Sequence, residues 1–502
     1  MDYSASKDDE VNELSETIKK KTGKAVIWSF TTEIIAKLIV PIVNIVLARL
    51  LTPNAFGAVA TINVVITFAE IFTDAGFQKY IVQHEFESDD QLDKGTNVAF
   101  WTNLSLSAIL VLLIVLFRHN IASMVGSENL GNAIGIASLV IIMVSFSSIQ
   151  TARFRRALDF KSLFFIRLGS SAIPLVVTVP LAFILRNFWA LVIGTLCVNL
   201  FNAVALTIKS KWKPQFYFDF KLFGQMFSFT AWSLLESLLV WLTLNADIFI
   251  VGNALDNYYL GLYKTSMTTV NSYMSIISSA VVPVLFSTLS RYQNDEEQFR
   301  VTYWKFFKYT AILVIPMSVG AFVFSDFLTS VLLGSQWSEA AGFIGLWGLM
   351  SGITIIFSNF ASEVYRSKGN PKLSMLVQAL HIVFVVPAVL ISVNHSFTFL
   401  YTVRAFMRIQ IVLTNIIIMK LAYKFKIYDM LKNVFPALVS TLIMAVAGFW
   451  LSNLMGNLWW QIISIFICIL VYFVSLLFLF PKIRRELFSL PFVKKHAMRR
   501  KK

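Results

Sequence analysis

The sequence has 502 residues, of which 57% are hydrophobic and 14% charged, and its mean hydropathy is +0.70. This composition excludes an ordinary soluble domain and predicts an all-α, multi-pass membrane protein. The net charge of +15 would suggest a nucleic-acid partner in a soluble protein. Here the basic residues follow a membrane topology, described below, and we expect no nucleic-acid partner.

The first 24 residues are polar, and we expect a cytoplasmic tail rather than a cleavable signal peptide. Val11, Leu14 and Ile18 recur at helical spacing just before Lys19–Lys21. This pattern is typical of a short helix at the lipid headgroups, and a disordered tail is the alternative.

About fourteen apolar segments follow, each long enough to cross a bilayer. We expect them near residues 25–50, 55–77, 96–117, 130–151, 163–185, 188–208, 227–252, 262–289, 304–333, 338–364, 373–393, 396–421, 433–453 and 458–480. The connections between them are short and leave no room for a soluble catalytic domain. We therefore expect no enzyme activity.

Lysine and arginine alternate between the two sets of connections, which predicts the orientation of the chain. Clusters of basic residues mark the connections on the side that holds both termini, and we expect that side to be cytoplasmic. These clusters are Arg153–Arg156 with Lys161 and Arg167, Lys209–Lys221, Arg291–Lys308, Arg366–Lys372, Lys420–Lys432 and the tail from Lys482. The connections on the other side carry few basic residues beyond Arg49, Arg118, Arg186 and Lys264.

Two pairs of segments resemble each other at a similar offset along the chain. Ala48–Gly57 and Val251–Gly261 each contain a helix end, a polar turn, an aromatic residue and a glycine that opens the next helix. Arg155–Ser162 and Tyr365–Lys372 form the second pair. Six predicted helices separate the copies, so the halves have the same orientation and form a parallel repeat, as in transporters.

The repeat predicts two six-helix lobes followed by an additional pair of helices. The expected divisions are a tail at 1–24, an N-lobe at 25–208, a linker at 209–226, a C-lobe at 227–421, the helix pair at 422–480 and a basic tail at 481–502.

Five short stretches in helices 1 to 11 resemble the polysaccharide exporters of the Wzx type. They are Leu47–Pro53 with Phe56-Gly57, Phe72–Phe77, Arg153–Lys161, Ala246-Asp247 through Tyr263, and Val282–Phe286 with Leu289–Arg291. These exporters are oligosaccharide-lipid flippases of the multidrug/oligosaccharidyl-lipid/polysaccharide exporter superfamily. Gln83-His84 departs from the usual family pattern of an apolar residue, a glutamine and a basic residue.

The resemblance implies a flippase of the bacterial cytoplasmic membrane that moves an undecaprenyl-pyrophosphate-linked oligosaccharide by alternating access. Its product would supply a capsule, exopolysaccharide or O-antigen, and its partners would include membrane lipids, a glycan polymerase and glycosyltransferases. It implies no cofactor beyond a coupling Na⁺ or H⁺ gradient. A peptidoglycan-precursor flippase and a small-molecule or cation antiporter of the same superfamily are the alternatives.

A pyrophosphate carried through a membrane protein needs cations, because a bare anion is costly in a low dielectric. Lys37 lies near the middle of the first segment, with Glu33 one turn before it. We expect substrate contact from Lys37 and Arg49, although a Glu33–Lys37 ion pair that only holds the helix is the alternative. The further candidate cations are Lys264, Arg404 and Arg408.

Acidic and polar side chains inside the segments are candidates for ion coupling and for sugar contact. The candidate coupling or cavity acids are Glu33, Glu70, Asp74, Glu236 and Asp247. Glu236 is the best single candidate, because no basic residue lies within a helical turn of it. The candidate sugar contacts are Asn44, Asn245, Trp232 and Trp241, which could equally form hydrogen bonds between helices. The sequence contains no phosphate-binding glycine loop and no metal-ligand spacing.

Overall fold

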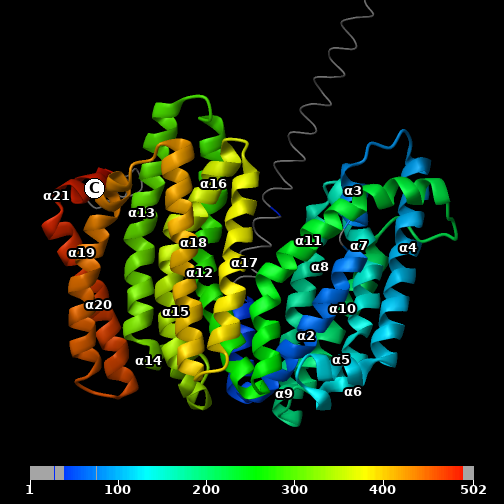
Figure 1. The fold of residues 1–502 in the computed structure, drawn as a ribbon, viewed down its shortest axis with the longest axis horizontal. Coiled ribbons are helices and arrows are strands. Elements are labelled where there is room, and N and C mark those ends of the chain that lie inside the picture. Colours follow the sequence, from blue (N-terminus) through cyan, green and yellow to red (C-terminus); the bar gives the residue numbers. More distant parts are fainter. Residues whose placement is uncertain (1–27, 29–38, 75, 490–502) are drawn as a thin grey trace, which may run out of the picture. The chain divides into compact units, whose positions relative to one another are not determined.

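The structure is a computed structural model that describes residue 28 and residues 39–74 and 76–489. Within this range it does not describe the side chains of residues 74, 228, 229, 231, 232, 235, 236 and 487–489. The described chain is α-helical and contains no β-strand, which confirms the predicted fold class (Figure 1). It forms two compact units, Met1–Gly261 and Leu262–Lys502.

The first unit begins, in the described range, with an apolar helix at Ile39–Leu50. It continues with α2 (Pro53–Asp74), α3 (Phe77–Gln83), α4 (Asp89–Leu116), α5 (Arg118–Met124), η1 (Glu128–Leu130), α6 (Gly131–Ala137), α7 (Leu139–Arg156), α8 (Phe160–Ile173), η2 (Pro174–Thr178), α9 (Val179–Leu185), α10 (Trp189–Lys209) and α11 (Phe220–Ala254). The first residues of α12 (Asn257–Arg291) also belong to this unit.

The second unit holds the rest of α12 and the helices that follow it. These are α13 (Glu296–Val323), α14 (Ser325–Leu332), η3 (Ser335–Ala340), α15 (Ala341–Thr354), η4 (Ile355–Asn359), α16 (Phe360–Ser367), α17 (Pro371–Ser392), α18 (Phe397–Tyr423), α19 (Ile427–Ser452), α20 (Leu458–Leu479) and α21 (Pro481–Ser489).

Thirteen helical stretches of the described chain are long and apolar enough to cross a membrane. They coincide with the second to the fourteenth predicted segments. The first predicted segment, 25–50, is described only at residue 28 and from residue 39 onward, so the full fourteen-helix layout stays a prediction. The protein is a multi-pass membrane protein.

The predicted lobe boundaries also stay a prediction. The division between the compact units falls within α12, later than the predicted start of the second lobe, because α11 packs against α2, α3 and α4. Helix α11 itself begins at Phe220, inside the stretch predicted as a linker.

The two units repeat one series of local structures. Ser88 and Asp295 cap α4 and α13, and each of these helices opens with two acidic residues. Both helices then break at a phenylalanine, Phe117 or Phe324, whose backbone leaves the helical region. A short helix and a glycine with positive φ follow in each unit, at Gly126 and at Gly334. This shared series supports the duplication inferred from the sequence.

The turn after α7 and the turn after α16 match in their backbone hydrogen bonds. Leu158 (φ 56°) and Gly369 (φ 74°) both adopt the left-handed conformation. The amide of Asp159 donates to the carbonyl of Phe154 at 2.9 Å, and that of Asn370 donates to Tyr365 at 2.8 Å. Only the second copy has the glycine that this conformation favours, so Leu158 carries a steric cost that its counterpart avoids.

Basic side chains converge at one end of each unit. In the first unit, Arg153 at the end of α7 pairs with Asp93 of α4, and its guanidinium lies over the Trp212 ring. Arg156 donates to the carbonyls of Ile81 and His84, which end α3. The arginines at the end of α7 therefore connect this helix to α4 and to the end of α3.

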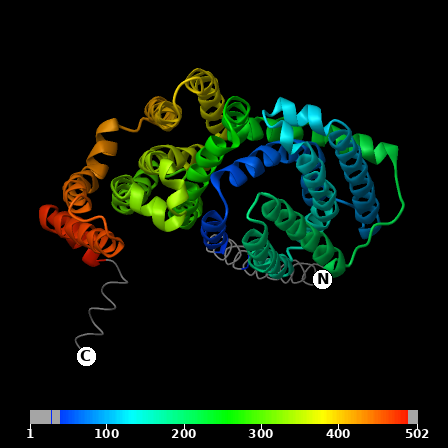
Figure 2. The ribbon, with the colours of Figure 1, turned by 90° about the horizontal axis from the view of Figure 1, so that it is seen from below.

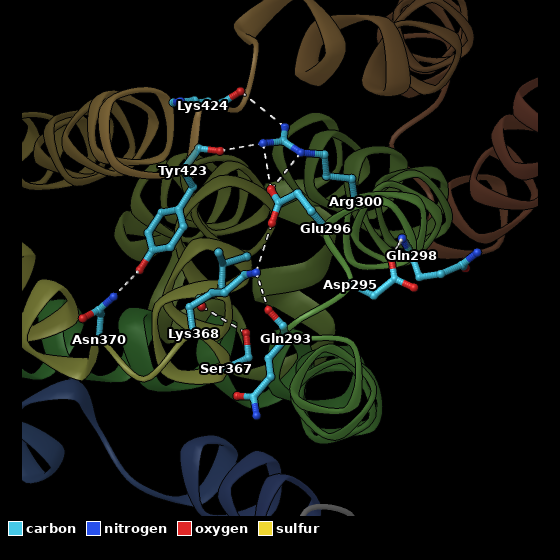
Figure 3. Close-up of polar contacts among 11 residues, drawn as sticks. Gln293, Asp295, Glu296, Gln298, Arg300, Ser367, Lys368, Asn370, Tyr423 and Lys424 are labelled. Atoms are coloured by element: carbon cyan, nitrogen blue, oxygen red, sulfur yellow. Dashed lines mark hydrogen bonds and ion pairs between the residues drawn. The ribbon is translucent and has the colours of Figure 1, made fainter.

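In the second unit, a network around Glu296, the first residue of α13, joins the helix ends at its basic end (Figure 3). The Glu296 carboxylate accepts hydrogen bonds from Arg300 at 3.0 Å and from Lys368 at 3.1 Å. Arg300 also donates to the carbonyls of Tyr423 and Lys424, where α18 ends. Figure 3 shows these contacts linking the ends of α13, α16 and α18.

The glycines of the first repeat face each other inside the first unit. A Cβ atom built on Gly57 of α2 would lie 1.7 Å from the carbonyl oxygen of Asn257. A Cβ atom on Gly261 would lie 1.9 Å from the carbonyl oxygen of Pro53. Two equivalent helix starts therefore meet backbone to backbone. The Asn257 side chain accepts hydrogen bonds beside this contact from Thr61 and from Ser127, at 3.4 and 3.1 Å.

We expect Gly57→Ala to force α2 and the start of α12 apart, because its methyl group would overlap a backbone oxygen that cannot rotate away. The predicted cost is about 1–3 kcal/mol of unfolding free energy, measured by titration with SDS in mixed micelles. Gly320→Ala in α13 is the matched control, since a Cβ there meets no atom within 4 Å. Equal stability of both variants would contradict the backbone contact.

Candidate functional site

Two arginines of α18 lie over one tryptophan of α15 in the interior of the second unit. The guanidinium carbon of Arg408 is 3.5 Å from the Trp347 ring centroid, and that of Arg404 is 5.0 Å from it. Trp347 is 1% exposed and Arg404 7%. The structure therefore brings together two of the five predicted cations and places both on an aromatic surface.

Polar groups from two helices hold this arrangement in place. Arg408 donates from Nη1 to the hydroxyl of Ser351, one turn after Trp347 on α15. The indole nitrogen of Trp347 donates to the Asn271 side chain of α12 at 3.3 Å. Since the rotamers of Trp347 and Arg408 are both fixed by hydrogen bonds, the two cations lie on a preorganised surface.

The α15–α18 seam explains why these residues meet. Phe343, Trp347 and Ser351 recur every four residues and so lie on one face of α15. Tyr401 stacks on Phe343 with ring centroids 5.3 Å apart, and Arg404 and Arg408 follow Tyr401 along the facing side of α18. The periodicity of the two helices thus sets the pairing.

Further along the contact between α15 and α18, the packing becomes polar. At this point the π-helical turn η4 lies between α15 and α16. Ser358 of η4 accepts a hydrogen bond from Asn415 of α18 at 2.9 Å. The Tyr365 hydroxyl donates to the same Asn415 side chain at 3.0 Å. π-Helical turns are frequent at functional sites.

Arg404 and Arg408 lie about 10 and 16 Å along α18 from its first residue, and therefore at the depth of the hydrocarbon core. A guanidinium over an aromatic face gains cation–π attraction, and its planar edge remains suited to binding phosphate oxygens in pairs. Chemically, this cluster is suited to holding a phosphate or pyrophosphate group.

Sequence reasoning identified the two arginines but missed Trp347 and Ser351. Both lie in a strongly apolar segment, where an indole is expected to be ordinary core. The available signal was their spacing of four residues, which places a hydrogen-bonding group and an aromatic ring on one helix face.

Two of the four predicted sugar contacts, Trp241 and Asn245, lie where α11 meets α2. The indole nitrogen of Trp241 donates to Thr67 of α2 at 3.1 Å, and its ring packs edge-on against Phe68. Asn245 donates to the Trp241 carbonyl at 3.1 Å. These contacts match the alternative interpretation, hydrogen bonds between and within helices, and leave sugar contact a prediction.

The remaining described candidates are spread over both units. Asp247 is buried, and its carboxylate accepts from the next backbone amide, that of Ile248, at 2.9 Å. Glu70 and Asn44 are half-buried, and Arg49 is exposed at the end of the apolar helix 39–50. Lys264 is half-buried on the second-unit part of α12.

Several predicted residues lie outside what the structure describes. Glu33 and Lys37 are outside the described residues, and the side chains of Asp74, Trp232 and Glu236 are likewise not described. Their roles stay predictions. Among the described residues, no group of three or more His, Cys, Asp or Glu side chains could hold a metal ion.

Comparison with known families gives a match over more than half of the chain. Residues 46–342 match the family described as "Polysaccharide biosynthesis protein". The chain belongs to this family. The match covers α2 to α14 and confirms the resemblance to Wzx-type exporters that the sequence indicated.

Curated relatives of this family member come from several bacteria. The succinoglycan biosynthesis transport protein ExoT of Rhizobium meliloti is 24% identical, with 69% of this chain and 68% of the relative covered. The lipopolysaccharide biosynthesis protein WzxC of Escherichia coli is 21% identical, with coverage of 72% and 70%. An uncharacterized membrane protein in the cps region of Klebsiella pneumoniae is 22% identical, with coverage of 75% and 77%.

Solved structures confirm the fold class. The lipid II flippase MurJ, in an inward closed conformation, aligns with a TM-score of 0.73 at 16% identity, covering 90% of this chain and 98% of that one. An inward-facing multidrug resistance MATE family transporter of the MOP superfamily aligns at 0.61 and 12% identity, covering 78% and 94%. The chain therefore shares the all-α fold of these two proteins.

We expect Trp347→Leu and Arg408→Ala to be energetically coupled, because the arginine loses its aromatic surface in the first variant. A double-mutant cycle on the free energy of unfolding should give a coupling of about 1–2 kcal/mol. Trp347→Phe keeps an aromatic ring and should retain most of the coupling. Additive effects of Trp347→Leu and Arg408→Ala would show that the two side chains do not interact.

Proposed function

We propose that this chain translocates a lipid-linked oligosaccharide across the bacterial cytoplasmic membrane for the synthesis of a surface polysaccharide. Family membership over residues 46–342 carries this proposal. The names of its relatives support it: one is a succinoglycan biosynthesis transport protein, and another is a probable low-salt glycan biosynthesis flippase of Haloferax volcanii, 26% identical over 125 residues. The proposed process is transport and involves no covalent step.

The Arg404–Arg408 pair provides a site for the charged part of such a substrate. A pyrophosphate crossing the hydrocarbon core needs cations along its route, and each guanidinium can form paired hydrogen bonds to phosphate oxygens. Trp347 stabilises both cations while the site is empty. The substrate headgroup would then replace water and neighbouring polar groups around the guanidinium edges during transit.

Other parts of the route remain proposals from the sequence. Lys37 and Arg49 are candidates for the first and later phosphate contacts, and Glu236 is the candidate coupling acid for a Na⁺ or H⁺ gradient. The substrate would be an undecaprenyl-pyrophosphate glycan, delivered by glycosyltransferases and consumed by a polymerase.

The proposed orientation places both termini in the cytoplasm. In each unit the arginines and lysines of the connections gather at one end, around Arg153 in the first and around Arg300 in the second. Positively charged connections are retained on the cytoplasmic side during insertion.

Arg404→Ala and Arg408→Ala are each expected to reduce export of surface glycan at least tenfold, since one charge-assisted contact to phosphate is lost. Export is measured as surface glycan in cells that lack their own exporter, at matched amounts of membrane protein. Arg408→Lys should fail to restore export, because an ammonium cannot form the stacked, two-pronged contact.

The matched control is Arg291→Ala, which removes an exposed arginine at the end of α12. Normal glycan in Arg404→Ala and Arg408→Ala cells would exclude the pair from the substrate route. In reconstituted vesicles, transport of a peptidoglycan-precursor lipid or of a small cation, without transport of the polyprenyl-linked oligosaccharide, would favour one of the alternative functions instead.

The orientation is tested by single-cysteine labelling in a background without Cys197 and Cys468. Asn187 and Asn457 are exposed in connections opposite the basic ends, and a cysteine there should react with a membrane-impermeant maleimide in intact spheroplasts. Lys372, exposed at a basic end, should react as a cysteine only in inverted vesicles. The reverse pattern would overturn the proposed topology.

A further inference from the structure

A groove lies between α8 and α10 at the basic end of the first unit, whereas the Arg404–Arg408 pair belongs to the second unit. The two helices pack against each other and lie side by side, in teal, in Figure 2. The groove has a volume of about 660 Å³, within the range of small-molecule sites. Its lining residues are Lys161, Ser162, Phe165, Ile166, Phe201, Ala205, Ile208 and Lys209.

The apolar part of the groove follows from alternating small and large side chains. Ala205 leaves a gap, and Phe201 and Ile208 flank it on the same helix. A Cβ atom on Gly169 of α8 would lie 2.8 Å from the Phe201 ring. The ring can therefore pack directly against the backbone of α8 only because Gly169 has no side chain. Phe165 is more than half exposed on the facing helix. The result is an apolar trough rather than a polar cavity.

Two lysines from different helices mark the mouth of the groove. Lys161 lies in the first turn of α8, and Lys209 is the last residue of α10. Both are exposed, and neither forms an ion pair with another residue in the described part of the chain. Among the described residues, no acid lines the groove. The neighbouring carboxylate, Asp159, is engaged by the amide and hydroxyl of Ser162 at 3.0 and 2.7 Å.

This combination selects for an amphipathic anion. Free phosphate would use the lysines but leave the apolar trough without a role, and a neutral lipid would leave the lysines without one. A glycerophospholipid with an anionic headgroup satisfies both, with its phosphate between the lysines and one acyl chain along Phe165, Phe201 and Ala205. Basic pockets between membrane helices favour such headgroups.

We infer that the α8–α10 groove is a binding site for an anionic phospholipid of the leaflet on the basic side of the protein. The groove shares no residue with the Arg404–Arg408 pair, and its proposed ligand is a lipid of the surrounding membrane rather than the transported molecule. Only the naming of the leaflet as cytoplasmic rests on the proposed orientation.

The test is a lipid titration of the purified full chain in detergent, followed by native mass spectrometry. The probes are phosphatidylglycerol and phosphatidylcholine with identical acyl chains. The intact chain should bind the first more tightly. Lys161→Ala/Lys209→Ala should weaken phosphatidylglycerol binding about 30-fold, from the attraction typical of two lysines at a membrane surface. Ala205→Trp should fill the trough and abolish the tight site.

Lys305→Ala/Lys372→Ala is the matched control, because both lysines are exposed near the basic end of the second unit and neither lines the groove. This variant should bind phosphatidylglycerol like the unchanged chain. Thermal unfolding of every variant, measured in parallel, identifies any that misfold. A misfolded double-alanine variant is replaced by Lys161→Gln/Lys209→Gln, which removes both charges and keeps a polar side chain at each position.

Three results would overturn the inference. The first is unchanged phosphatidylglycerol binding in folded groove variants, and the second is equally tight binding of phosphatidylcholine. The third is displacement of the lipid by millimolar inorganic phosphate, or by a polyprenyl phosphate at concentrations below those of the bound lipid. Such displacement would reassign the groove to a free anion or to the substrate tail. Because no transport is measured, failure here leaves the proposed function untouched.

Discussion

A positive charge within the hydrocarbon depth of a membrane is the constraint on which the interior of the second unit depends. Placing an arginine at that depth costs several kcal/mol unless the protein supplies a polar or polarisable environment. Here that environment includes the indole face of Trp347 and the hydroxyl of Ser351. The α15–α18 seam is organised around this need, with aromatic stacking on one side of the cations and amide hydrogen bonds on the other.

The cost of burying a positive charge also helps to distinguish an arginine that binds a ligand from one that only holds two helices together. A guanidinium that is fully enclosed by carboxylates would hold two helices together and offer little to a ligand. A guanidinium over an aromatic ring is attracted by the ring face and still carries several N–H donors that can bind an anion. The arrangement of Arg408 on Trp347 is therefore compatible with a headgroup that arrives and leaves.

Membrane segments were predictable from the sequence because each requires about 20 apolar residues, and thirteen of the predicted segments coincide with described helices. The repeat was predictable at its turns, since Leu158 and Gly369 adopt the same backbone. Which side chains pair with each other was much harder to predict from the sequence. Arg404 and Arg408 stood out as charges in an apolar run, but Trp347 is defined as their partner only by the packing of two distant segments. The network around Glu296 was not predicted either, because its members come from three helix ends that are far apart in the sequence.

The meeting of Gly57 with Asn257, and of Gly261 with Pro53, has a consequence for the history of the chain. After a gene duplicates internally, its two copies usually diverge independently. At this crossing each copy presses directly on the main chain of the other, so neither glycine can acquire a side chain unless the opposite copy retreats by the same amount.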